Sequence, residues 1–357
     1  MLHPNGRAVG GTEINGATLW VSGTGIAVLA IHSSLIQHAH GMSQKRPPKL
    51  PPNSQLSPPT TSTKTDVVFA SVYALPGATG CVLVLRLHAA ACDRTTVVLL
   101  LRELLTLMAV DEEGQKEITK NKGEISLDIE DLLPRGMAKK TLWARGVDIS
   151  TQVVRLIINP ADTKKILSGC KEKGIKLCGA LGATGLIAAH SSKSISDHQK
   201  KKYGVVTLTD CRSILEPPLS DHHFGFYHSA ILNTHTIKGG EKLWDLAKKT
   251  YTAFTNYKSS GRHLSDMADL NFFMSRAMEN PSLTPSSSLR TCLISVFEDT
   301  VVDESNDQKN QVGVEDYMGC ASGHGIGSSI AVFDTICNGR LDCICVYPSP
   351  LHSREQM

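Results

Sequence analysis

His88 and Asp93 are the residues whose types and spacing most clearly suggest chemistry. They flank a short segment, HAAACD, that follows a predicted strand and precedes a predicted helix. Histidine titrates near neutral pH, so a histidine at the end of a strand can take a proton from an alcohol or an amine. An alternative is that the aspartate just before the helix is its N-terminal cap and has no part in catalysis. Because a histidine and an aspartate at this spacing are common, the pair alone is a weak indication of catalysis.

The segment that holds His88 and Asp93 lies between elements that the apolar pattern predicts. Runs rich in β-branched residues predict strands over 66–74 and 81–87, joined by a Pro-Gly turn. A leucine-rich helix is predicted over 95–110. The histidine would therefore sit where a strand ends, and the aspartate where a helix begins.

The second half of the chain alternates strands and helices. After a strand over 152–158, Asn159-Pro160 predicts a helix start, and Gly174 predicts its end. Further helices are predicted over 177–189 and 241–257, and further strands over 204–210, 224–236, 289–297, 329–336 and 340–347. Strands and helices without a strict order are typical of mixed sheets covered by helices, so the predicted fold class is α/β.

The chain length predicts two domains. Its 357 residues suffice for two ordinary cores, and we place the boundary near 146–150. The N-terminal domain would then span 1–148 and the C-terminal domain 149–357. Residues 44–65 are rich in Pro, Ser and Thr, so they are predicted to form an extended or disordered loop inside the first domain. We expect this loop to be the most mobile internal segment and the first site of proteolysis.

The composition excludes several classes of protein. Apolar residues make up 41% and charged residues 20%, and the net charge is only +3, with no basic run that would indicate a nucleic-acid or anionic-membrane partner. No apolar stretch approaches the ~20 residues of a membrane span, and no secretory signal is evident. The ten cysteines form no CxxC pair, which predicts reduced thiols in a cytoplasmic protein without a metal site.

Three segments together resemble a known family. They are HAAACD at 88–93, the run TDCR…LEPPL…FG at 209–225, and ILSGCKEKGIKLCGALGATGLIAA at 166–189. They resemble the chloramphenicol-acetyltransferase-like superfamily of coenzyme-A-dependent acyltransferases, whose plant BAHD members carry a similar Asp-x-Arg…Pro-Pro-Leu…Phe-Gly segment. The sequence as a whole is most similar to plant condensation-domain proteins, and the resemblance covers about 66–357. It implies two α/β domains that meet at a cleft.

The resemblance also implies an activity and roles for three residues. Members of the superfamily transfer an acyl group from acyl-CoA to an alcohol or amine, with a histidine at a strand end as the base. Their motif is two histidines, three free residues, an aspartate and a glycine. Asp93 would then be structural and would form a buried ion pair with Arg212, while His88 would be the catalytic residue. Acyl-CoA would be the co-substrate, a small molecule would be the acceptor, and no cofactor would be bound.

The histidine motif departs from the family pattern by one position. If Asp93 is aligned with the family aspartate, Ala89 occupies the base position and Arg94 replaces the glycine. If His88 is aligned as the base, Cys92 replaces the aspartate. Two functions therefore stay open: an acyl-CoA-dependent acyltransferase, or an inactive homologue that binds a ligand or partner in the cleft. Because alanine cannot accept a proton, we expect thioester turnover near background and little effect of His88→Ala.

Both ends of the chain also depart from the family pattern. The region before the histidine motif is short and proline-rich, and no Asp-Phe-Gly-Trp-Gly segment follows later. Ser353 and Gln356 form a capping-box pattern that normally opens a helix, yet Met357 is the last residue. We therefore expect the chain to be shortened relative to a complete family member.

Overall fold

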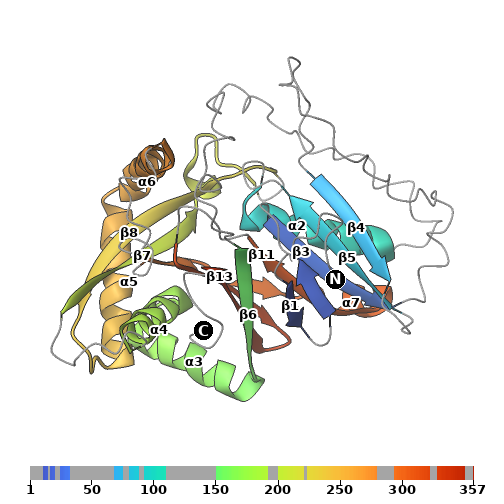
Figure 1. Ribbon diagram of the computed structural model, residues 1–357, viewed down its shortest axis with the longest axis horizontal. Coiled ribbons are helices and arrows are strands. Elements are labelled where there is room, and N and C mark those ends of the chain that lie inside the picture. Colours follow the sequence, from blue (N-terminus) through green and yellow to red (C-terminus); the bar gives the residue numbers. More distant parts are fainter. Residues whose placement is uncertain are drawn as a thin grey trace, which may run out of the picture.

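The computed structural model describes 11–14, 17–20, 25–32, 68–74, 80–87, 92–109, 150–191, 200–220, 223–279, 293–321, 328–349 and 357. Within these residues, two sheets carry most of the strands, and helices cover them (Figure 1). The predicted α/β class with mixed sheets is confirmed. The loop over 44–65 and the capping box at Ser353 lie outside the described residues. So does the predicted boundary near 146–150, except for Ser150, where β6 begins.

The larger sheet is built from the second half of the chain. Its strands are, in spatial order, β6 (Ser150–Ile158), β13 (Arg340–Ser349), β12 (Ile330–Cys337), β9 (Leu293–Phe297), β7 (Lys201–Asp210) and β8 (His228–Ile237), with β10 (Val301–Asp303) beside β12. The strands β12, β9 and β7 run parallel, whereas β6, β13 and β8 pair antiparallel with their neighbours. The sheet is therefore mixed.

The smaller sheet combines early and late parts of the chain. It is antiparallel throughout, in the order β11 (Val314–Cys320), β3 (Gly25–His32), β5 (Gly80–Leu87) and β4 (Val68–Ala74). Two helices pack with it, α2 (Arg94–Ala109) and α7 (Asn306–Val312). A separate hairpin consists of β1 (Gly11–Ile14) and β2 (Ala17–Trp20).

The remaining helices accompany the larger sheet: α3 (Pro160–Lys173), α4 (Leu177–Ser191), α5 (Leu243–Ser259) and α6 (Arg262–Glu279). Small residues let α4 lie close to its neighbours. A Cβ at Gly179 would come within 2.8 Å of the Tyr251 side chain of α5, and one at Gly185 within 2.9 Å of Ile294 of β9. The glycine-rich sequence of α4 is thus required for this packing, because larger side chains would collide with the main core.

The ends of α3 form as the sequence predicts. The Asn159 side chain accepts a hydrogen bond from the backbone amide of Asp162 at 2.9 Å. Gly174 ends the helix with φ of 65°, a left-handed conformation that glycine adopts without strain. Both capping predictions are confirmed.

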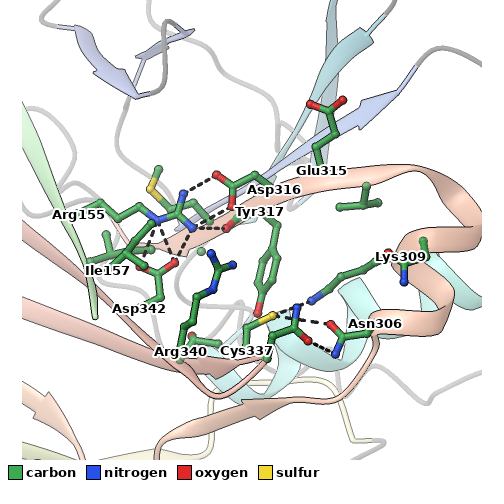
Figure 2. Close-up of a pocket in the computed structure, with 17 residues that line it drawn as sticks. Arg155, Ile157, Asn306, Lys309, Glu315, Asp316, Tyr317, Cys337, Arg340 and Asp342 are labelled. Carbon is green, nitrogen blue, oxygen red and sulfur yellow. Dashed lines mark hydrogen bonds and ion pairs between the residues drawn. The ribbon is translucent and has the colours of Figure 1, made fainter. Parts of the chain in front are cut away.

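An arginine joins the two sheets. Arg155 of β6 contacts Asp342 of β13 in the same sheet and Asp316 of β11 in the other, at 2.5 Å for the nearest atoms of each pair (Figure 2). Two carboxylates on one guanidinium hold the pKa of Arg155 above its usual value, although burial acts in the opposite direction. An apolar cluster that includes Val153, Met318 and Ile344 packs in the same region. The two sheets are therefore fixed to each other by both charge and packing.

The strand β8 begins later than the apolar pattern predicts. The pattern predicts a strand from Phe224, but β8 starts at His228. The backbone just before it bonds elsewhere: Gly225 accepts a hydrogen bond from the amide of Asp93 at 3.1 Å, and Tyr227 donates one to the Asp93 carboxylate at 2.8 Å. Because these backbone groups bond to Asp93 at the start of α2, they are not available to pair with β7.

Candidate functional site

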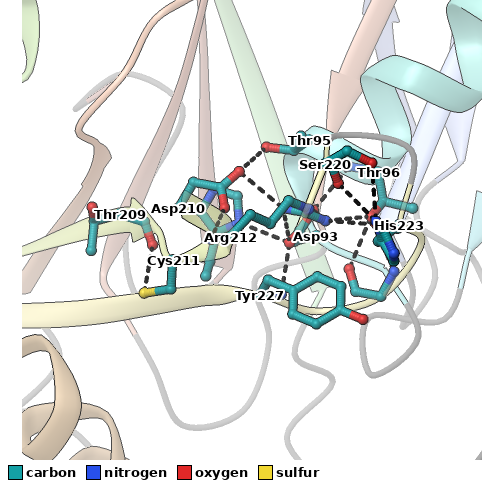
Figure 3. Close-up of polar contacts among 12 residues, drawn as sticks. Asp93, Thr95, Thr96, Thr209, Asp210, Cys211, Arg212, Ser220, His223 and Tyr227 are labelled. Atoms are coloured by element: carbon teal, nitrogen blue, oxygen red, sulfur yellow. Dashed lines mark hydrogen bonds and ion pairs between the residues drawn. The ribbon is translucent and has the colours of Figure 1, made fainter. Parts of the chain in front are cut away.

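The site is centred on a buried ion pair between Asp93 and Arg212 (Figure 3). Arg212 Nη1 lies 2.9 Å from Asp93 Oδ2, and Arg212 Nη2 lies 3.1 Å from Asp93 Oδ1. Asp93 is 5% and Arg212 is 2% exposed. The contact is bidentate, which is the strongest arrangement of these two groups. The expected contact between these two residues is therefore present.

Asp93 also caps the helix that follows it. Its Oδ1 accepts a hydrogen bond from the Thr96 backbone amide at 2.9 Å, and its Oδ2 accepts one from the Tyr227 amide at 2.8 Å. Burial alone would raise the pKa of Asp93. Contacts with His228, Arg212 and the two amides outweigh burial and hold the pKa well below its usual range. Asp93 is thus an ionised carboxylate that joins the start of α2 to the segment before β8.

Arg212 connects further parts of the site. It contacts Asp210 at 2.9 Å, the hydroxyl of Thr96 at 3.0 Å and the carbonyl of His223 at 3.3 Å. The Thr95 hydroxyl in turn donates to Asp210 at 2.8 Å. The Asp-x-Arg segment therefore contacts the first turn of α2 at several points.

Arg94, which stands where the family motif has glycine, forms a second buried pair. Arg94 Nη1 lies 3.1 Å from Asp334 Oδ1, and the Asp334 side chain is fully buried. The Arg94 guanidinium also lies over the Phe297 ring, 4.4 Å from its centroid. Burial lowers the pKa of Arg94, while Asp334 acts to raise it. The substitution thus has a partner on β12, and it ties α2 to the larger sheet.

An apolar cavity of about 300 Å³ adjoins Asp93. It lies between α2, the segment at β8, the strands β9, β10 and β12 of the larger sheet, and β11 of the smaller one. Its apolar lining includes Val97, Leu101, Phe226, Phe297 and Phe333. A cavity of this size with a few polar groups at one wall is typical of a small-molecule site.

His228 is a cavity residue that the sequence did not single out. Its side chain is 8% exposed and lines the cavity, and its Nδ1 lies 3.0 Å from Asp93 Oδ2. The only indication in the sequence was its position just after the Phe-Gly of the second family segment. Nothing in that pattern shows that it returns to Asp93, because the contact depends on how β8 pairs.

Two cysteines also line the cavity. Burial, with a smaller contribution from Asp93, raises the pKa of the Cys92 thiol to about 11, and burial raises that of Cys320 to about 12. Neither thiol is ionised at neutral pH, so neither is an activated nucleophile.

His88 and Ala89, at the predicted base position, lie outside the described residues, so the role of His88 stays a prediction. Within the described ranges, no group of His, Cys, Asp and Glu side chains is arranged to hold a metal ion. In the same part of the chain, no helix is long and apolar enough to cross a membrane.

Comparison with known proteins gives similarity of fold. No protein-family model matches the sequence, and no curated protein matches it either. Among solved structures, polyketide synthase associated protein 5 from Mycobacterium tuberculosis matches with a TM-score of 0.59 at 16% identity, over 83% of this chain and 73% of that one. The trichothecene 15-O-acetyltransferase TRI3 from Fusarium sporotrichioides gives 0.54 at 11% identity, over 79% and 64%.

A third match is the first condensation domain of the CDA synthetase, with a TM-score of 0.52 at 14% identity, over 81% of this chain and 63% of that one. The chain thus spans slightly less than two thirds of the length of two of these three structures. The chain has the two-domain chloramphenicol-acetyltransferase-like fold, as the resemblance implied.

Proposed function

We propose that this chain transfers an acyl group from acyl-CoA to an alcohol or amine acceptor and holds the acyl chain in the apolar cavity. The observation that carries the proposal is the cavity of about 300 Å³, whose lining includes His228 and Asp93, the carboxylate that Arg212 holds from behind. The fold, shared with an acetyltransferase and a condensation domain, supports the class of reaction.

The cavity suits an acyl chain better than a polar substrate. Phe226, Phe297 and Phe333 offer it aromatic surface, and burial of an apolar chain there removes it from water. Each buried methylene contributes about 0.8 kcal/mol, or about fourfold in affinity. Affinity for acyl-CoA should therefore rise with chain length until the cavity is full.

The test is a turnover screen of the full chain with acyl-CoAs of increasing chain length and a panel of alcohols and amines. Release of coenzyme A is measured together with the mass of the acylated acceptor. We expect acceptor-dependent release, with kcat/KM that rises with chain length and then levels off. Release no faster than in protein-free buffer for every pair would contradict the proposal.

One observation favours a second function. Ala89 stands at the base position in one alignment, while the cavity is retained. The chain would then bind an acyl ligand without turning it over. Saturable binding of acyl-CoA by calorimetry, with no acceptor-dependent release, would identify this alternative.

We predict direct transfer to the acceptor, without an acyl-cysteine intermediate. Cys92 and Cys320 line the cavity, but burial keeps both thiols protonated, so neither should attack a thioester. Intact-protein mass spectrometry after brief mixing with acyl-CoA, without acceptor, should show no added acyl mass. The same chain mixed with a thiol-reactive acylating agent in denaturant serves as the positive control. An acyl adduct mapped to either cysteine under native conditions would refute direct transfer.

A further inference from the structure

We propose that His228 is the general base of this acyl transfer and that Asp93 orients it. The inference rests on the proposed function and adds the residue that touches the reacting atoms. The inference assigns the base to a histidine outside the 88–93 segment. The imidazole of His228 would accept the proton that Ala89 cannot.

The position of His228 fits this role. It is the first residue of β8, its side chain is nine-tenths buried, and it lines the cavity proposed for the acyl chain. Two aromatic rings flank the imidazole: the centroid of Phe297 lies 5.9 Å away in an edge contact, and that of Phe226 lies 6.5 Å away. These neighbours restrict the ring, so its two nitrogens have defined surroundings.

The two ring nitrogens of His228 differ. Nδ1 is buried and lies 3.0 Å from Asp93 Oδ2, although it has no hydrogen-bond partner at a favourable angle. Among the described residues, no hydrogen-bond donor or acceptor contacts Nε2, and Nε2 is not among the buried unpaired atoms. Nε2 is therefore the nitrogen available to a substrate.

Asp93 favours the useful tautomer of His228. Its carboxylate stays ionised because Arg212 and two backbone amides contact it. A negative charge beside Nδ1 stabilises the tautomer in which Nδ1 carries the proton, which leaves the lone pair on Nε2. The same logic orients the histidine of serine hydrolases, where an aspartate contacts the nitrogen that does not take part in proton transfer.

The step balances without any further reactant. Nε2 takes the proton from the acceptor hydroxyl or amine as its oxygen or nitrogen attacks the thioester carbonyl carbon. The tetrahedral intermediate collapses, the carbon–sulfur bond breaks, and the imidazolium returns the proton to the departing sulfur. Coenzyme A leaves as the free thiol, and the acceptor leaves as an ester or amide.

The experiment compares His228→Gln with His235→Gln in the full chain. His235 is buried on the same strand but lies outside the cavity, so the same substitution there is a matched control. A placed base contributes about 10²–10⁴-fold, so kcat of His228→Gln should fall at least about 100-fold. The Kd of a non-hydrolysable thioether analogue of acyl-CoA should stay within about threefold, because binding does not need the base. His235→Gln should keep kcat.

The outcomes separate this inference from the proposed function. Acceptor-dependent turnover by the wild type that survives in His228→Gln overturns the base assignment and leaves the acyltransferase proposal intact. So does a result in which His88→Ala abolishes turnover and His228→Gln does not. Absence of turnover in the wild type, despite binding of the analogue, overturns both proposals. If His228→Gln loses turnover and its affinity for the analogue falls in parallel, His228 has a structural role and the base assignment is overturned.

Discussion

The Arg212→Ala substitution should lower the free energy of unfolding by about 3–5 kcal/mol. It removes the guanidinium that makes two contacts with Asp93, at 2.9 and 3.1 Å, in a site where both side chains are almost fully buried. Asp93 would be left as a buried charge without its ionic partner. Chemical denaturation followed by circular dichroism measures the change.

Two further variants complete this experiment. Lys165→Ala breaks an ion pair with Asp162 in which both side chains are largely exposed, so its stability should hardly change. If Arg212→Ala does not fold, the double variant Asp93→Leu with Arg212→Met should recover folded protein, because it removes both charges at once. An Arg212→Ala protein as stable as Lys165→Ala would show that the pair contributes little.

The same pair sets a dependence on pH. The pKa of Asp93 lies well below its usual range in the folded chain, whereas in the unfolded chain it is about 3.9. A lowered folded-state pKa means that the unfolded state binds the proton more readily. The stabilisation is therefore fully present above about pH 4 and is lost as the pH falls through the folded-state value. The difference in stability between wild type and Arg212→Ala should shrink over that acidic range.

The Ala331→Trp substitution should weaken acyl binding by about 100-fold or more, which corresponds to about three to four methylenes that can no longer be buried. Ala331 of β12 lines the cavity beside Phe333, and an indole there would occupy much of the 300 Å³ that the acyl chain needs. Because the new side chain enters space that is already empty, folding should suffer less than binding. Calorimetry with a thioether analogue of a medium-chain acyl-CoA measures the affinity.

A tryptophan placed elsewhere is the control. Ala161 is exposed near the start of α3, and no residue of α3 lines the cavity. Ala161→Trp should therefore bind the analogue as the wild type does. Unchanged affinity in Ala331→Trp would show that the acyl group lies outside this cavity. The thermal midpoint of each variant, measured in parallel, separates a blocked cavity from an unfolded chain.

Local patterns predicted much of the fold. The cap at Asn159, the stop at Gly174 and the small-residue helix α4 follow from residues near one another in the sequence, and each formed. The contact of Asp93 with Arg212 was also predictable, because each residue sits in a recognisable family segment.

The features that sequence reasoning missed depend on distant pairings. Because the Tyr227 amide bonds to Asp93, β8 begins only at His228, and the pattern of apolar residues gives no sign of this hydrogen bond. His228 reaches the cavity only because β8 pairs with β7 in one register. In the same way, Arg155 lies in one sheet and its partner Asp316 in the other, so the sequence around Arg155 could not predict this ion pair.

The pairing of β11 with β3 has a consequence for biosynthesis. Residues 314–320 must pair with residues 25–32 before the smaller sheet is complete. One edge of β3 therefore has no pairing strand until residues 314–320 have left the ribosome. An open strand edge is a site of association with other chains, and contacts between such distant segments form slowly. We therefore expect the nascent chain to be most prone to association with other chains until residues 314–320 have emerged.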